Sequence, residues 1–254
     1  MSDRGNVAME DLSAEALAEA LPGREVRSYP AMLSTEADAL AWARSGAPSG
    51  AVVVADYQAS PRGRAGRPWQ VRPPGQGLGF SVVLRPQLPP EREGWLYTVA
   101  VSALADVAEQ RGTSDDAEPE VGILWPDEVV DRGTRAGAVG VYVELGPDRL
   151  EWAVATFLVE WARPPRGPLL ATLLDELERR VSSGPEAVLA DYTPRCVTFG
   201  RQVKARLIPM GPAGPTITGV AVDTLADGAL VIATAAGRRV AVPPQNLGLL
   251  EEAL

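Results

Sequence analysis

A cationic loop between two apolar runs constrains the fold of this chain most. Residues 61–69 read Pro-Arg-Gly-Arg-Ala-Gly-Arg-Pro-Trp, and apolar runs of strand length precede them at 51–55 and follow them at 78–84. Guanidinium groups are costly to bury without partners, and glycine lets the backbone approach a ligand closely. The segment therefore predicts a loop between two strands that closes over a phosphate or an adenylate. A plain solvated turn is the alternative.

Composition excludes several kinds of function. The chain of 254 residues has a net charge of -9, which argues against general nucleic-acid binding and leaves the loop as the clear local basic site. It has no histidine, so imidazole bases and histidine-ligated metals are excluded. A single cysteine, Cys196, cannot form an internal disulfide. No apolar run is long enough to span a membrane, and the acidic N-terminus lacks the regions of a signal peptide. We therefore expect a cytoplasmic protein without a membrane partner.

Periodicity predicts two regions of different architecture. Helical spacing predicts helices over 13–21, 34–45 (with Thr35 as a cap), 93–110 (with one apolar face), 169–181 and 185–191. Apolar runs predict strands over 25–29, 51–56, 78–84, 121–125, 138–145 and 150–160. Four shorter strands are expected over 202–208, 216–222, 230–233 and 238–242. The pattern predicts an N-terminal helical segment (1–24), an α+β domain (25–195) and a small β-barrel (196–254).

The order of the motifs is more specific than any one of them. Ser34 and Thr35 head a helix, Gln58 leads into the cationic loop, Trp125-Pro126-Asp127-Glu128 follows a strand, and Phe199-Gly200-Arg201-Gln202-Val203 opens the C-terminal β segments. In this order, from about residue 25 to the end, the motifs resemble those of the biotin–protein ligases in the biotin/lipoate A/B protein ligase superfamily.

The resemblance implies a fold and an activity. The fold would be a mixed sheet flanked by helices, followed by a small SH3-like β-barrel. Such ligases join biotin and ATP, with Mg²⁺, to biotinyl-5′-AMP and pass the biotinyl group to a lysine of a biotin carboxyl carrier domain. No protein-held metal is implied. Some members carry an N-terminal DNA-binding domain, for which the first 24 residues are too few, so no DNA binding is expected. Members often dimerise through a sheet edge, which makes a homodimer an expectation here.

The resemblance also assigns candidate residues. Ser34, Thr35 and Gln58 would face the ureido ring of biotin. The loop would hold the carboxylate and the phosphate through Arg62, Gly63, Arg64 and Arg67. Trp69 would cover the apolar tail or the adenine. Trp125 is a further candidate for substrate contact, with packing in the core as the alternative.

The chain departs from the family pattern at several positions. The block Lys-Trp-Pro-Asn-Asp appears as Leu124-Trp125-Pro126-Asp127-Glu128, which loses a cation and gains an anion. The catalytic lysine of the next hairpin aligns with Gly137 without a gap, or with Arg135 after a slip of two residues. Arg135 is therefore the candidate catalytic residue. The end of the following strand reads Leu158-Val159-Glu160-Trp161 where the family has Gly-x-Gly-x-Asn. Glu36 replaces an asparagine, and Pro61 replaces the first glycine of the loop.

These departures leave four functions open. The first is an active, divergent biotin–protein ligase. The second is a non-catalytic relative that binds biotin, an acyl-adenylate or a carrier domain without turnover. The third is the same scaffold acting on lipoate or another carboxylic acid. The last is a soluble α+β domain with an interaction role only.

Overall fold

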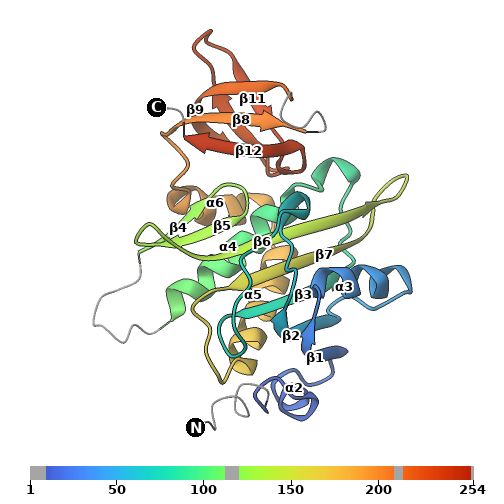
Figure 1. Cartoon of the computed structure of the whole chain (residues 1–254). Helices are drawn as coiled ribbons and strands as arrows, with labels where there is room; N and C mark the ends of the chain where they lie inside the picture. Colours follow the sequence, from blue (N-terminus) through green and yellow to red (C-terminus); the bar gives the residue numbers. More distant parts are fainter. Residues whose placement is uncertain (1–9, 112–119, 209–213, 253–254) are drawn as a thin grey trace.

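The protein is a two-sheet α+β structure (Figure 1). The computed structural model describes residues 10–111, 120–208 and 214–252, so residues 1–9 of the predicted N-terminal segment and 253–254 lie outside it. The helices are α2 (Ala14–Ala20), α3 (Thr35–Arg44), α4 (Trp95–Gln110), α5 (Gly167–Ser182) and α6 (Pro185–Arg195). Within the described part, no helix is long and apolar enough to cross a membrane.

A seven-stranded mixed sheet forms the larger part. Its strands are β1 (Val26–Met32), β2 (Val52–Gln58), β3 (Leu78–Leu84), β4 (Val121–Leu124), β5 (Glu128–Asp131), β6 (Thr134–Leu145) and β7 (Leu150–Val159). The spatial order is β1-β2-β3-β7-β6-β5-β4, and only the β1–β2 pair is parallel. The two runs that flank the cationic loop are both strands, as the sequence predicts, and they are antiparallel neighbours, so the loop must leave and re-enter the sheet at the same end.

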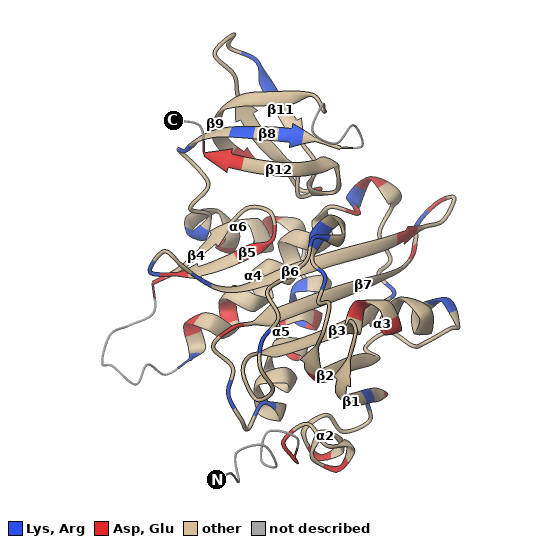
Figure 2. Ribbon diagram, viewed as in Figure 1, with Lys and Arg blue, Asp and Glu red and all other residues tan. Residues whose placement is uncertain are grey.

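A five-stranded antiparallel sheet follows. It contains β8 (Gln202–Leu207), β9 (Thr216–Thr224), β10 (Leu230–Ala233), β11 (Arg239–Val242) and β12 (Leu247–Glu252). The order is β11-β10-β9-β8-β12, so this sheet, like the first, is open at both edges. Figure 2 shows basic residues on β8 beside the acidic end of β12, where Lys204 pairs in register with Glu251.

Helices cover both faces of the larger sheet. α3 packs on β2, β3 and β7, whereas α4 packs on β4, β5 and β6 and is itself covered by α5 and α6. The sequence predicts one apolar face for α4, but the structure buries every residue from 95 to 108. The reason is that α4 lies between a sheet and two helices, so it has no solvent face over most of its length.

The buried charged residues inside this layer are paired. Asp106 on α4 accepts hydrogen bonds from Arg180 at 2.7 and 2.8 Å and from Arg195 at 2.9 Å. Arg166, which is fully buried, lies 2.7 Å from Asp11 and 2.6 Å from Asp56. These contacts fix the N-terminal segment and α5 to the sheet, since a buried guanidinium needs charged partners.

Three expectations from the sequence need correction. Thr35 is the first helical residue rather than the cap: Ser34 stands at the N-cap, without a side-chain capping bond. Strand β5 (Glu128–Asp131) was not among the predicted strands; it pairs with β4 and β6. Strand β12 was not predicted, because Leu247–Glu252 has a leucine pair and a glycine in place of an alternating pattern.

Candidate functional site

The cationic loop lies on the face of the sheet that α3 also covers. A short 3-10 turn (Arg64–Gly66) sits against β6, where Gly140 leaves room for it. A Cβ built on Gly140 would stand 3.1 Å from the Cα of Gly63 and 3.2 Å from the backbone nitrogen of Arg64. Ala65 adopts a left-handed conformation with φ 53°. The sequence therefore forms a closed loop whose backbone contacts the sheet directly.

The loop is also fastened to the C-terminal sheet. Arg64 donates a hydrogen bond to the carbonyl oxygen of Leu247, and Arg67 donates one to that of Gly248. Both acceptors lie in β12. Arg62 is instead exposed and bonds within the loop, to the carbonyl oxygen of Gly66 at 3.0 Å. Of the three arginines predicted to hold a ligand anion, Arg64 is therefore buried between the sheets, whereas Arg62 and Arg67 are exposed.

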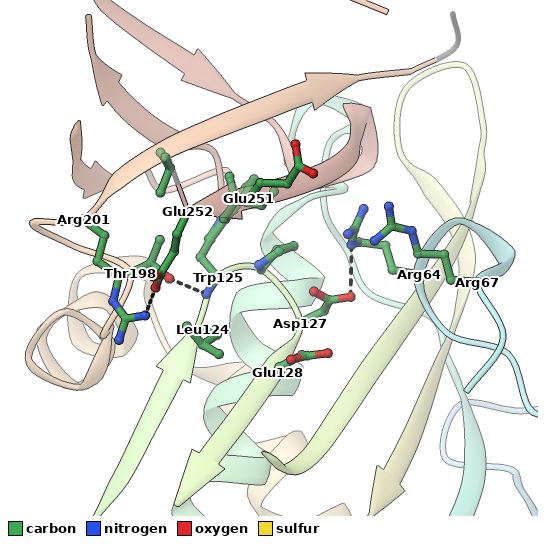
Figure 3. Close-up of a pocket in the computed structure, with 13 residues that line it drawn as sticks. Arg64, Arg67, Leu124, Trp125, Asp127, Glu128, Thr198, Arg201, Glu251 and Glu252 are labelled. Carbon is green, nitrogen blue, oxygen red and sulfur yellow. Dashed lines mark hydrogen bonds and ion pairs between the residues drawn. The ribbon is translucent and has the colours of Figure 1, made fainter. Parts of the chain in front are cut away.

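Arg64 has a carboxylate partner. Its Nε lies 3.0 Å from Oδ2 of Asp127, and the two side chains are only 5% and 17% exposed (Figure 3). Burial raises the pKa of Asp127, although the adjacent Arg64 opposes that shift. Burial also lowers the pKa of Arg67, with Arg64 as the next cause. The most buried arginine of the loop is thus already paired with a carboxylate.

A cleft of about 270 Å³ opens between the two sheets at this point. Figure 3 shows Arg64 and Arg67 on one side of it and Arg201, paired with Glu252, on the other. Its lining combines three arginines, four carboxylates and a group of apolar and small residues: Arg64, Arg67, Arg201, Asp127, Glu128, Glu251, Glu252, Leu124, Trp125, Pro126, Thr198, Val203 and Leu250. Such a lining can bind a polar ligand at the interface of the two sheets.

A buried network of hydroxyl and amide groups lies at the head of α3. The Gln58 side-chain oxygen accepts hydrogen bonds from the Thr35 backbone nitrogen at 2.8 Å and from the Thr35 hydroxyl at 3.1 Å. Ser81 donates to the Thr35 hydroxyl at 2.9 Å and lies 2.8 Å from the hydroxyl of Thr156. The network holds the Gln58 amide in one orientation, with its nitrogen over Gly79, where a Cβ would stand 2.2 Å away.

One member of this region has no partner among the described residues. The hydroxyl of Ser34 is buried, with 6% of the residue exposed, and makes no hydrogen bond. Buried hydroxyls are normally paired, so this hydroxyl, on the residue that precedes Thr35, is a free hydrogen-bonding group at the head of α3. The cavity next to Gln58 and Leu158 is about 30 Å³, which is room for one water. A larger ligand would require the loop or Leu158 to move.

Arg135, the predicted catalytic residue, lies elsewhere. Its guanidinium is 3.5 Å from Glu128 and 3.4 Å from Glu160, and it lines a separate open cavity of about 220 Å³ together with Arg72, Arg111 and Trp161. Gly137, the alternative position, faces Leu104 of α4 on the opposite side of the sheet from the loop. Neither alignment puts a cation beside Arg64. The one lysine of the chain, Lys204, is not among the residues that line the cleft.

Three tryptophans lie in or near the loop and the cavities, and each packs against a different partner. Trp125 is 3% exposed, and its indole nitrogen donates to the carbonyl oxygen of Gly228 at 2.9 Å, so it joins the two sheets and forms one wall of the cleft. Trp69 packs its ring over Gly63, where a Cβ would stand 2.3 Å from the indole nitrogen. Trp161 lies under the guanidinium of Arg111, 5.1 Å from the ring centroid.

Sequence reasoning missed part of this site. Ser81 and Thr156 carry hydroxyls in otherwise apolar strands, and that interruption is the signal that could have identified them. The pairing of Arg64 with Asp127 and the carbonyl acceptors in β12 have no local signal, since 63 and 183 residues separate the partners. Over the described ranges, no group of three or more carboxylates or thiols is arranged to hold a metal ion.

Comparison with known proteins places this geometry in a family. No protein-family model matches the chain. It is 32% identical over 232 residues to a Biotin--[acetyl-CoA-carboxylase] ligase of Mycobacterium tuberculosis, covering 82% of this chain and 83% of the relative. It is also 32% identical over 123 residues, 48% of this chain and 35% of the relative, to the bifunctional ligase/repressor BirA of Bacillus subtilis.

Solved structures share the fold. A biotin protein ligase from Aquifex aeolicus in complex with biotin and ATP aligns with a TM-score of 0.63 at 21% identity, covering 90% of this chain and 99% of that one. A biotin protein ligase-like protein of unknown function from Silicibacter aligns with a TM-score of 0.65 at 14% identity, covering 88% and 96%. Taken with the sequence relatives, these matches show that the chain belongs to the biotin protein ligase family.

Proposed function

We propose that this protein is a biotin protein ligase-like protein that binds biotin at the head of α3 and transfers it, with ATP, through biotinyl-5′-AMP to a lysine of a biotin carboxyl carrier domain. The observation that carries the proposal is the buried network of Thr35, Gln58 and Ser81 beside the unpaired hydroxyl of Ser34. A cyclic urea has two N–H donors and one carbonyl acceptor, which match a hydroxyl and an oriented amide. The named relative from Mycobacterium tuberculosis supports the reaction class.

The chemistry requires two displacements. A biotin carboxylate oxygen bonds to the α-phosphorus of ATP, and the bond to pyrophosphate breaks. The amine of the carrier lysine then bonds to the acyl carbon, AMP leaves, and the amine loses a proton. In this chain Arg64 and Arg67 are the loop arginines that line the cleft, so they would stabilise phosphate charge. The closed loop would exclude water from the mixed anhydride.

A second candidate is binding of biotin or a carrier domain without turnover. Three observations favour it. Arg64 is paired with Asp127, Arg135 lies in another cavity, and the single lysine is outside the cleft. A phosphate placed near Asp127 would meet a negative charge, and one unit charge at about 4 Å changes the interaction by roughly 1–4 kcal/mol at high effective dielectric.

One experiment separates these candidates. The purified protein is titrated with biotin by calorimetry and then incubated with biotin, ATP-Mg and a carrier domain, with pyrophosphate release and carrier mass as readouts. Labelled carrier supports the ligase, and biotin binding without label supports the second candidate. Lipoate and octanoate, run in parallel, test the acyl group. If no acid binds, both candidates are wrong.

We place the domain boundary at 195/196 and propose that the C-terminal sheet curves into an SH3-like barrel. We propose a cytoplasmic protein whose partners are biotin, ATP and a carrier domain, with no nucleic acid. We also propose a homodimer through a sheet edge; the outer side of β4 is already in part occupied, because the backbone nitrogen of Val197 donates to the carbonyl oxygen of Ile123 at 3.0 Å.

A further inference from the structure

In the cleft between the sheets, the most buried arginine, Arg64, is paired with a carboxylate of the same chain, that of Asp127. The Arg64 guanidinium donates from Nε to Asp127 at 3.0 Å and from another nitrogen to the Leu247 carbonyl. With 5% of the side chain exposed, these partners replace the water that a free guanidinium would bind. The cation that could receive a ligand anion is therefore neutralised by a carboxylate of the same chain.

The other carboxylates of the cleft have arginine partners of their own. Arg201 is paired with Glu252 on the opposite wall, Glu128 lies 3.5 Å from Arg135, and Glu251 lies 3.7 Å from Arg206. The lining as a whole carries one negative charge more than it has positive charges. A phosphate-bearing ligand would enter against this balance.

We infer that Asp127 is the specificity-determining residue of this cleft: its carboxylate takes the place of a ligand's phosphate on Arg64, so the loop is held closed without a nucleotide and phosphate ligands bind only by displacing Asp127. The inference deepens the proposed function, because it rests on the loop as the anion-binding side. It does not depend on biotin binding.

The test uses inorganic pyrophosphate, without metal, as the probe. Calorimetry at low ionic strength compares the full chain with D127N, since salt would screen the difference. We expect D127N to bind pyrophosphate about tenfold more tightly, because Arg64 becomes available and one repulsive charge is removed. An unchanged or weaker affinity would overturn the inference.

A matched control separates position from net charge. E128Q removes one negative charge from the same lining, but Glu128 contacts Arg135 rather than Arg64. We expect a gain of less than about threefold for E128Q. Equal gains in the two variants would mean that only the total charge matters, which contradicts a specific role for Asp127.

A double variant identifies the recipient of the anion. In an R64Q background the gain from D127N should disappear, since the receiving guanidinium is absent. A gain that persists there would also overturn the inference. D127S, which removes the charge with a shorter side chain, replaces D127N if that variant does not fold. Biotin titration of the unsubstituted protein tests the proposed function separately. The inference about Asp127 can be right when biotin does not bind, and it can be wrong when biotin does bind.

Discussion

Gly228 and Gly94 meet backbone to backbone at the junction of the two sheets. A Cβ built on Gly228 would stand 2.4 Å from the carbonyl oxygen of Gly94, and one built on Gly94 would stand 2.6 Å from the carbonyl oxygen of Asp227. Gly94 precedes α4, and Gly228 lies in the turn between β9 and β10. The contact therefore fastens the C-terminal sheet to the N-terminal end of the central helix.

Gly228→Ala should weaken this junction. Gly228 has φ +85°, so alanine adds about 1 kcal/mol of backbone strain, and the clash with a backbone carbonyl adds more. We expect a loss of about 2–4 kcal/mol and two unfolding transitions in place of one, measured by calorimetry. Gly237→Ala is the control, because φ is +73° there with nothing within 4 Å. Equal losses in the two variants would contradict the close contact.

Arg166→Ala should be among the most destabilising single changes in the chain. The substitution leaves Asp11 and Asp56 buried without their cation, which typically costs about 3–5 kcal/mol. Chemical denaturation measures the loss. Arg163→Ala, at an exposed position three residues earlier, should change stability by less than about 0.5 kcal/mol. A loss below about 1 kcal/mol for Arg166→Ala would contradict the burial of this ion pair.

Glu36→Gln should change the pH dependence of stability. Burial raises the pKa of Glu36 above its ordinary value of 4.5, with an opposing effect of Arg62. The protonated carboxyl is thus favoured in the folded state, so its contribution to the free energy of unfolding is full below pH 4.5 and is lost as pH rises through the raised pKa. Glutamine does not titrate. We expect the variant to melt higher than the parent at pH 7.5, with a difference that shrinks toward pH 4.

Thermal melts over this pH range check the prediction. Glu19→Gln, at an exposed position of α2, is the control and should show no such trend. A parent and a Glu36→Gln variant with parallel pH profiles would exclude a raised pKa for Glu36.

Gly79→Ala should weaken biotin binding without unfolding the protein. The new Cβ would stand 2.2 Å from the Gln58 amide nitrogen, which can swing away because it ends a flexible side chain. The amide would then leave the orientation that Thr35 holds. Calorimetric titration with biotin measures the effect, and we expect at least tenfold weaker binding. Gly184→Ala, with nothing within 4 Å, should bind as the parent does. Unchanged binding in Gly79→Ala would argue against Gln58 as a biotin ligand.

Local patterns in the sequence account for most of the elements. The run 78–84 is a strand over its full predicted length, and the cationic loop lies between two strands as expected. The helix 185–191 was predicted too short, since α6 continues through Pro194 to Arg195. Strand β12 was not predicted because polar and apolar residues do not alternate along it. Secondary-structure propensity depends on a few neighbouring residues, so it cannot predict the ends of helices and strands that tertiary packing sets.

For the candidate site too, the sequence predicted the position of some residues and not of others. The resemblance brought together Ser34, Thr35 and Gln58, which do lie at one point of the fold. The roles of these residues and of Arg62, Gly63, Arg64, Arg67, Trp69, Trp125 and Arg135 in binding or catalysis stay predictions. Arg135 could not be placed from sequence, because a register shift between Val129 and Val130 sets it opposite Val130 and beside Glu160.

The amino-acid order by itself determined the α+β succession, the strands on either side of the cationic loop and the residue types available for chemistry. It did so because hydrophobic periodicity and composition act locally along the chain. Only the tertiary structure decided that Asp127 neutralises Arg64 and that β12 fastens the loop. Those contacts join residues 63 to 183 positions apart, and the energy of a charge depends on which partners and how much water surround it after folding.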